Sequence, residues 1–260
     1  GLEEAMKTKR LVAYHTSQPD DLSNYQYTVR TVPGQVAKVQ SPVDMILKLK
    51  PQTLAIISLD LAETRKDMSD VKKLLEPAGI DVILEDYVQA GTSDLSPYVT
   101  KVKRADPDVL LTKFDSPSDG MNLFKAAASL GGWGDIDVVF WSPGSYLTWS
   151  MSAAEGTYHY APWIPGSDQP GARKFEEGFK AKYNRTPGVA ELYVYDNLWT
   201  VINAIKLANS DDPADIVAAA RSGKMEWESP YGLQRFETSG ENNTKGQFVR
   251  IEGGKPIVVQ

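Results

Sequence analysis

Cysteine is absent from the 260 residues of this sequence. Its absence excludes disulfide bonds, thiol catalysis and zinc or iron–sulfur sites built on cysteine. Histidine occurs only twice, and the sequence contains no H-E-x-x-H, G-x-S-x-G or P-loop motif. We therefore predict no catalytic residues, no metal and no cofactor, and we do not expect an enzyme.

The sequence also has no strongly basic segment and no long apolar run. Its formal net charge is -6, and the most basic stretch, residues 101–104, lies beside the acidic residues Asp106 and Asp108. Binding to nucleic acid is excluded, because phosphate recognition needs a clustered basic face. No apolar run approaches the roughly 20 residues of a membrane span. The length favours two domains, since a single core stops growing near about 250 residues.

Short apolar runs alternate with helical patterns through the middle of the chain. The runs begin at residues 54, 80, 108 and 136, a spacing close to the roughly 30 residues of a βαβ unit. Each of the first three is followed by apolar residues at helical spacing. The pattern predicts an α/β fold with a parallel sheet flanked by helices.

The alternation stops at Gly34 on one side and at Pro162 on the other. Three helical patterns follow residue 165, and the tail is typical of short antiparallel hairpins. We expect one lobe to comprise residues 1–34 and 163–236, and the other to comprise residues 35–162 and 237–260. Three crossings would then join the lobes. Within the helix after Gly34, Pro42 predicts a kink or a late helix start.

Ligands of open parallel sheets bind at the carboxyl ends of the strands, where loops and helix N-termini present unpaired N–H groups. This rule selects four loops, at residues 15–20, 59–63, 113–118 and 141–146. His159, by contrast, lies within an alternating strand pattern, and we expect it to be structural.

Several phrases carry a family resemblance: Y-H-T-S-Q-P-D-D-L at 14–22, Y-Q-Y-T-V-R-T at 25–31, T-S-D-L-S at 92–96, A-D-P-D-V at 105–109, A-E-G-T at 154–157, and residues 190–196. Their order and spacing resemble the periplasmic substrate-binding proteins of branched-chain amino-acid ABC transporters. The resemblance implies the two-lobed type I periplasmic-binding-protein fold with three interlobe crossings. It also implies an initial segment of several βα units, on the order of 100 residues, before the position matching Gly1. Without that segment the first lobe is incomplete at its N-terminal side.

The resemblance further implies a function. We expect an extracytoplasmic solute-binding protein that captures a small carboxylate-bearing ligand, an amino acid or a related compound, by lobe closure. It would deliver this ligand to the membrane permease of an ABC importer. We expect a monomer in the periplasm or outside the cell, with a cell-surface lipoprotein as an alternative. Two other functions stay open: the ligand-binding sensory domain of a receptor, and a binding protein for an aromatic acid or amide.

The resemblance implies that loop 15–17 holds the ligand's carboxylate and amino groups. Members of the family that bind amino acids often carry an acidic residue in the loop matching 141–145, where this chain has W-S-P-G-S. Asp115 would supply the missing charge, and Trp141 would suit a flat ligand by stacking. The alternative for His15 is a turn residue satisfied by its neighbours. The predicted ligand-binding residues are His15, Thr16, Ser17, Glu63, Asp115, Trp141, Ser142, Gly144 and Ser145.

Overall fold

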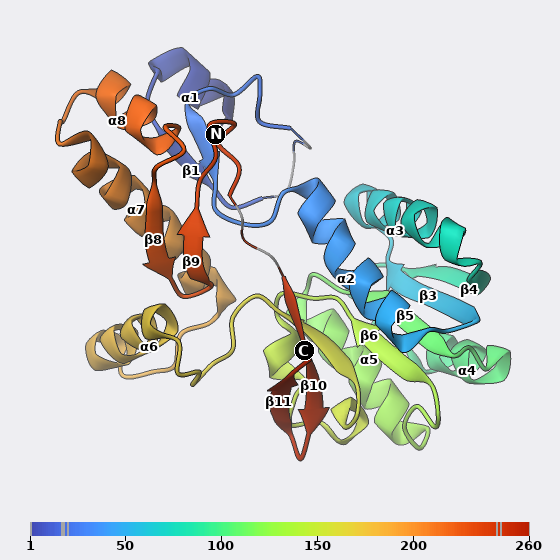
Figure 1. Cartoon of the computed structure of the whole chain (residues 1–260). Helices are drawn as coiled ribbons and strands as arrows, with labels where there is room; N and C mark the ends of the chain where they lie inside the picture. Colours follow the sequence, from blue (N-terminus) through green and yellow to red (C-terminus); the bar gives the residue numbers. More distant parts are fainter. Residues whose placement is uncertain (1, 17–18, 20, 243, 245, 260) are drawn as a thin grey trace. The chain divides into compact units, whose positions relative to one another are not determined.

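The computed structural model describes residues 2–16, 19, 21–242, 244 and 246–259, and it divides into two compact units (Figure 1). Unit 1 comprises Gly1–Lys38 and Trp163–Lys245. Unit 2 comprises Val39–Pro162 and Gly246–Gln260. Within the described residues, no helix has both the length and the apolar character needed to cross a membrane.

Unit 2 is built on a sheet with the strand order β11-β10-β7-β6-β5-β3-β4. The five strands β3 to β7 are parallel, whereas β10 and β11 pair antiparallel at one edge. The predicted parallel sheet is therefore confirmed. The strands are β3 (Thr53–Leu59), β4 (Asp81–Val88), β5 (Val109–Lys113), β6 (Asp137–Phe140), β7 (Tyr158–Ala161), β10 (Gln247–Glu252) and β11 (Lys255–Val258).

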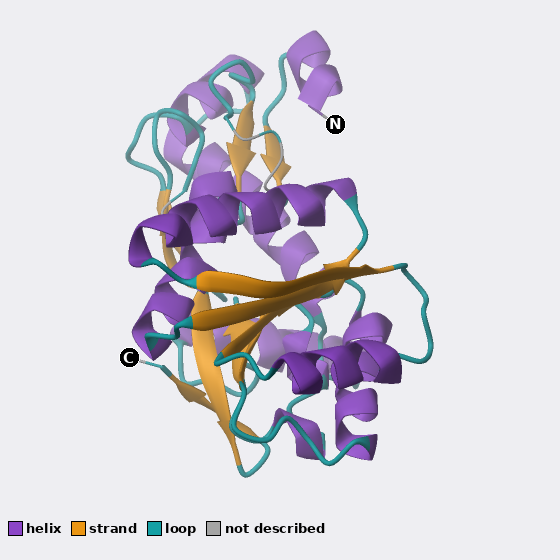
Figure 2. Cartoon of the chain, turned by 90° about the vertical axis from the view of Figure 1, so that its right-hand side faces the viewer, coloured by secondary structure: helices purple, strands orange, loops and turns teal. Residues whose placement is uncertain are grey.

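Helices cover both faces of this sheet, as Figure 2 shows. Helices α2 (Gln35–Leu49) and α3 (Ala62–Leu75) pack on one face, where Ile46 and Met68 join Ile56 of β3 in one buried cluster. Helices α4 (Ser96–Ala105) and α5 (Pro117–Ser129) lie on the other face. There Phe124 of α5 packs edge-on against Phe140 of β6, with ring centroids 5.1 Å apart.

Helix α2 begins at Gln35 and continues through Pro42. The expectation of a late helix start is therefore wrong, which leaves the kink as the surviving alternative. Pro42 has no N–H to donate to the helix. Burial of Val39, Val43 and Ile46 on the sheet stabilises the helix by more than this missing hydrogen bond, since each such side chain contributes about 1.5–3 kcal/mol.

Unit 1 has a small parallel sheet formed by β1 (Val12–Tyr14) and β2 (Thr28–Arg30). Val29 of β2 packs with Ala204, Ala220 and Phe236 in one buried cluster. The hairpin of β8 (Glu226–Ser229) and β9 (Gly232–Arg235) was not predicted, because Trp227 is the only large apolar residue in β8. The other elements are α1 (Leu2–Thr8), α6 (Pro170–Tyr183), α7 (Val189–Ala208), α8 (Pro213–Ala220), β8 (Glu226–Ser229) and β9 (Gly232–Arg235).

Residues 237–245, which the sequence assigns to lobe 2, lie in unit 1. Their contacts with β2 explain the difference. The Glu241 carboxylate accepts a hydrogen bond of 2.7 Å from Nε of Arg30, and the Gly240 carbonyl accepts one of 2.8 Å from the Arg30 backbone N–H. These pairings join residues more than 200 positions apart in the chain, so no local pattern could indicate them.

Candidate functional site

The carboxyl ends of β3 and β5 mark the switch point of the sheet in unit 2. β4 pairs with one side of β3 and β5 with the other. Crevices that bind ligands in open parallel sheets lie at such points. The loops predicted at residues 59–63, 113–118 and 141–146 follow β3, β5 and β6 and therefore leave the same edge of the sheet.

A buried ammonium group lies at this edge. Lys113, the last residue of β5, is 4% exposed, and its Nζ lies 2.6 Å from Oδ2 of Asp115 and 3.4 Å from Oδ2 of Asp67. The same Nζ lies 5.6 Å from the centroid of the Trp141 ring, a cation–π distance. Burial alone lowers the pKa of Lys113, but the charges of Asp115 and Asp67 outweigh it and raise the pKa above its ordinary value. Lys113 is therefore charged at neutral pH.

Asp115 is thus already engaged by a lysine. Glu63, in the first turn of α3, is exposed and also acts electrostatically on Lys113. Three carboxylates around one ammonium leave the cluster with negative charge, so a ligand ammonium would compete with Lys113 for Asp115. Within the described part of the chain, no group of three or more histidine, cysteine, aspartate or glutamate side chains is arranged to hold a metal ion.

The loop after β6 is mostly internal. Trp141 is 2% exposed and belongs to the core of unit 2, so its ring is not presented at the surface. Ser142, Gly144 and Ser145 are also buried. The Ser145 hydroxyl donates to the Tyr160 carbonyl at 2.6 Å. The Ser142 Oγ, however, has no hydrogen-bond partner among the described residues, which leaves it as the loop group still able to bond a ligand or water.

In unit 1 the predicted loop follows β1. His15 is exposed; its ring stacks on Tyr193, with centroids 5.5 Å apart, and its Nδ1 lies 2.9 Å from Nδ2 of Asn197. Sequence reasoning missed both partners, because they lie on α7, far along the chain. Thr16 is half-buried, and Ser17 lies outside the described residues.

The buried side chain of Arg30 holds this loop in place through hydrogen bonds. Its side chain is fully buried and pairs with Glu241 through Nε at 2.7 Å. The guanidinium also donates to the carbonyl of Pro19 at 2.6 Å and to the carbonyl of Thr16. A buried charge needs such compensation. One guanidinium therefore holds the carbonyl of Thr16, a predicted carboxylate-binding residue, and the carbonyl of Pro19, which follows the predicted residues. A charged residue inside an otherwise extended, uncharged run was the available signal in the sequence.

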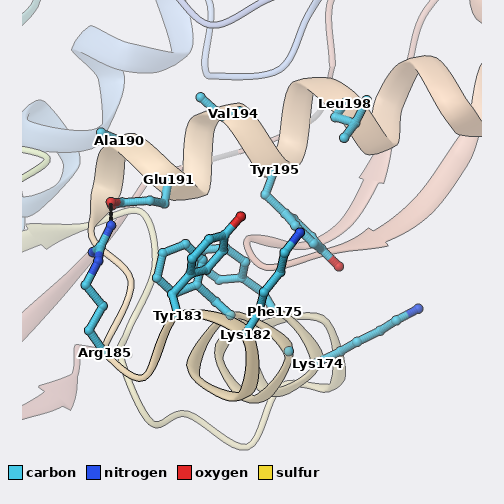
Figure 3. A pocket seen from close by; sticks show the side chains of 12 residues that line it. Lys174, Phe175, Lys182, Tyr183, Arg185, Ala190, Glu191, Val194, Tyr195 and Leu198 are labelled. Carbon is cyan, nitrogen blue, oxygen red and sulfur yellow. Dashed lines mark hydrogen bonds and ion pairs between the residues drawn. The ribbon is translucent and has the colours of Figure 1, made fainter.

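A groove of about 640 Å³ lies between α6 and α7 of unit 1 (Figure 3). The groove is lined by aromatic side chains, those of Phe175, Phe179, Tyr183 and Tyr195. Val194, which also lines it, is 67% exposed, so the groove is open to solvent. None of the predicted ligand-binding residues that the structure describes lines this groove. It also lies on a different face of α7 from Tyr193 and Asn197, so we do not place the site there.

Comparisons with known proteins agree on one family. Residues 1–255 match the family described as periplasmic binding protein. The leucine-, isoleucine-, valine-, threonine- and alanine-binding protein of Pseudomonas aeruginosa is 26% identical over 199 residues, covering 75% of this chain and 51% of that protein. The chain spans about half the length of the curated relatives that it matches.

Solved structures show the same fold. A solute-binding protein of an ABC transporter from Rhodopseudomonas palustris, in complex with 3,4-dihydroxybenzoic acid, has a TM-score of 0.81 at 22% identity and covers 99% of this chain and 73% of its own. An ABC transporter substrate-binding protein from Desulfitobacterium hafniense, in complex with Leu, has a TM-score of 0.74 at 17% identity, over 99% of this chain and 76% of its own.

Proposed function

Because this chain belongs to the periplasmic binding protein family, we propose that it forms part of the solute-binding component of an ABC importer. It would bind a small ligand reversibly and deliver it to a membrane permease, without chemical conversion. The observation that carries this proposal is the set of loops at the carboxyl ends of β3, β5 and β6, which gather charged and hydroxyl groups at a switch point. The two solved structures are named as binding proteins of ABC transporters, which favours transport over a sensory receptor.

The ligand class is a small carboxylate. Leucine and 3,4-dihydroxybenzoic acid, which are named with the relatives, differ in shape and in the ammonium group, but both carry a carboxylate. In unit 1, the proposed role of His15, Thr16 and Ser17 is to bind this carboxylate. The anchoring of the loop by Arg30 supports that role, because a binding loop must be held in place before the ligand arrives.

In unit 2, the proposed role of Asp115 is to receive an ammonium group, with Glu63 contributing negative charge. Ser142, Gly144 and Ser145 would contact the remainder of the ligand, with the buried Ser142 hydroxyl as the strongest candidate for a hydrogen bond. The expected stacking of Trp141 on the ligand is not proposed, because its ring lies in the core of unit 2. Because Lys113 already occupies Asp115, an aromatic acid without an ammonium group is the alternative ligand.

Membership of a periplasmic family implies an extracytoplasmic location. The monomeric state, the permease partner and a lipid anchor stay predictions. So does capture by lobe closure, which small-angle X-ray scattering tests: closure predicts a smaller radius of gyration with saturating ligand, whereas unchanged curves would contradict it.

A thermal-shift screen of amino acids, amides and aromatic acids tests the ligand class, because a ligand at 100 times its Kd stabilises the native state by about 2.7 kcal/mol. Asp115→Asn then separates the two kinds of acid. It should weaken an amino acid about tenfold or more but leave an aromatic acid nearly unchanged. Asp168→Asn, which removes a fully exposed carboxylate of unit 1, is the matched control. Equal effects of both variants would contradict a role for Asp115.

A further inference from the structure

Three side chains in unit 1 form a hydrogen-bonded relay that ends at His15. The Thr31 Oγ1 lies 2.6 Å from Oδ1 of Asn197, and Nδ2 of Asn197 lies 2.9 Å from Nδ1 of His15. Thr31 is buried directly after β2, whereas His15 is exposed directly after β1. The relay therefore connects the interior of unit 1 to the loop that we propose binds the ligand.

The order of donors and acceptors in this relay fixes the tautomer of the His15 imidazole. The Thr31 hydroxyl donates to Oδ1 of Asn197, and the longer contact of the same hydroxyl, 3.3 Å, is to the Tyr14 carbonyl. The Asn197 amide then presents its N–H to His15. A ring nitrogen that accepts a hydrogen bond carries no proton, so the neutral imidazole carries its proton on Nε2.

The ring plane is fixed as well. Tyr193 lies one helical turn before Asn197 on α7, and residues at this spacing share a face of a helix. Its ring stacks on that of His15 with an interplanar angle of 20°. The position, plane and protonated nitrogen of His15 are thus all set by α7 and Thr31 before any ligand binds.

We propose that His15 donates a hydrogen bond from Nε2 to a carboxylate oxygen of the ligand, and that Asn197 and Thr31 are positioning residues that keep it a donor. The inference rests on the proposed function, since it assumes that the loop after β1 meets the carboxylate. It selects ligands with an acceptor oxygen, because a donor has no favourable partner in an ammonium or amide N–H group.

Nitrogen-15 NMR of the imidazoles tests the relay without any ligand. The chain has two histidines, and His159→Gln assigns their signals. At pH 9 the wild-type His15 should show a protonated Nε2. Asn197→Asp should invert the pattern, because a carboxylate accepts from Nδ1–H. Asn203→Asp, which places the same charge elsewhere on α7, should leave it unchanged. A protonated Nδ1 in the wild type would overturn the relay.

Calorimetric titration with 3,4-dihydroxybenzoate and L-leucine tests the donor role. Asn197→Asp should weaken the bound probe about tenfold or more, and Asn203→Asp should change its affinity less than twofold. Thr31→Val, which adds no charge, should weaken the probe by a smaller factor in the same direction. Wild-type affinity in Asn197→Asp would overturn the donor role. If neither probe binds the wild type, the carboxylate ligand class fails and the donor role with it, while the NMR pattern still decides the relay.

Discussion

The ion pair of Arg30 with Glu241 should be a main determinant of the stability of unit 1. The Arg30 side chain is 0% exposed, whereas that of Glu241 is 24% exposed. Arg30→Met removes the charge-assisted bonds to Glu241 and to the carbonyls of Thr16 and Pro19. Breaking a buried pair by removing one partner costs about 3–5 kcal/mol. We expect a loss in this range in the free energy of unfolding of unit 1.

The matched control is Arg235→Met. Arg235 pairs with Glu226 at 3.0 Å, but the two side chains are 62% and 56% exposed, and exposed pairs contribute about 0–1 kcal/mol. Glu241→Gln completes a double-mutant cycle. Because both substitutions break the same contact, the double variant should lose less stability than the sum of the single losses.

Hydrogen exchange in increasing urea is the suitable assay, because peptides from β2 and α7 report on unit 1 while peptides from β5 report on unit 2. Arg30→Met should shift only the first set. If Arg30→Met costs no more than Arg235→Met, or if the cycle is additive, the buried pair does not hold this part of the unit.

Other expectations concern pH, the buried lysine and one helix contact. Burial raises the pKa of Asp196 to about 7 and lowers that of His159 to about 3. Between pH 4 and 6.5, the stability of unit 1 should therefore fall with rising pH and that of unit 2 should rise, each by about 1.4 kcal/mol per pH unit. Hydrogen exchange in increasing urea, repeated across this pH range, checks this. Slopes of unfolding free energy against pH that persist in Asp196→Asn and His159→Gln would refute it. Lys113→Met removes the cation that lies 3.4 Å from the buried Asp67 carboxylate and should destabilise unit 2 by about 3–5 kcal/mol; a loss below about 1 kcal/mol in the same assay would argue against the pair. A Cβ at Gly171 would clash with the Ser229 carbonyl oxygen, whereas one at Gly178 on the same helix meets nothing within 4 Å. Gly171→Ala should thus lower the urea midpoint of unit 1. Gly178→Ala should raise the midpoint, because it increases the free energy of unfolding of unit 1 by up to about 1 kcal/mol. Equal shifts of the midpoint would contradict the steric argument.

The sequence predicted the central parallel strands β3 and β5 well because they are buried on both faces. β3 and β5 appear as continuous apolar runs, a signal that depends only on local residues. The hairpin β8–β9 was missed because its stability comes from pairing and from the contact of Trp227 with a distant cluster. In α2, tertiary burial overrode the local effect of Pro42.

The candidate site was predictable only in outline. The loops follow from the rule on strand ends, which needs no contact information. The pairing of Asp115 with Lys113 lies within reach of a sequence argument, since the two residues are two positions apart. The partners of His15 were not accessible in this way, because Asn197 lies 182 positions away along the chain.

The central claim, recognition of a small carboxylate, is tested most directly by comparing each acid with its amide by titration calorimetry. The pairs are 3,4-dihydroxybenzoate with 3,4-dihydroxybenzamide, and L-leucine with L-leucinamide. The account predicts that the acid of at least one pair binds, and that its amide binds about tenfold or more weaker, because hydrogen bonds to a charged oxygen contribute about 1.5–3 kcal/mol. Equal affinity of acid and amide, or binding of neither acid, would contradict it.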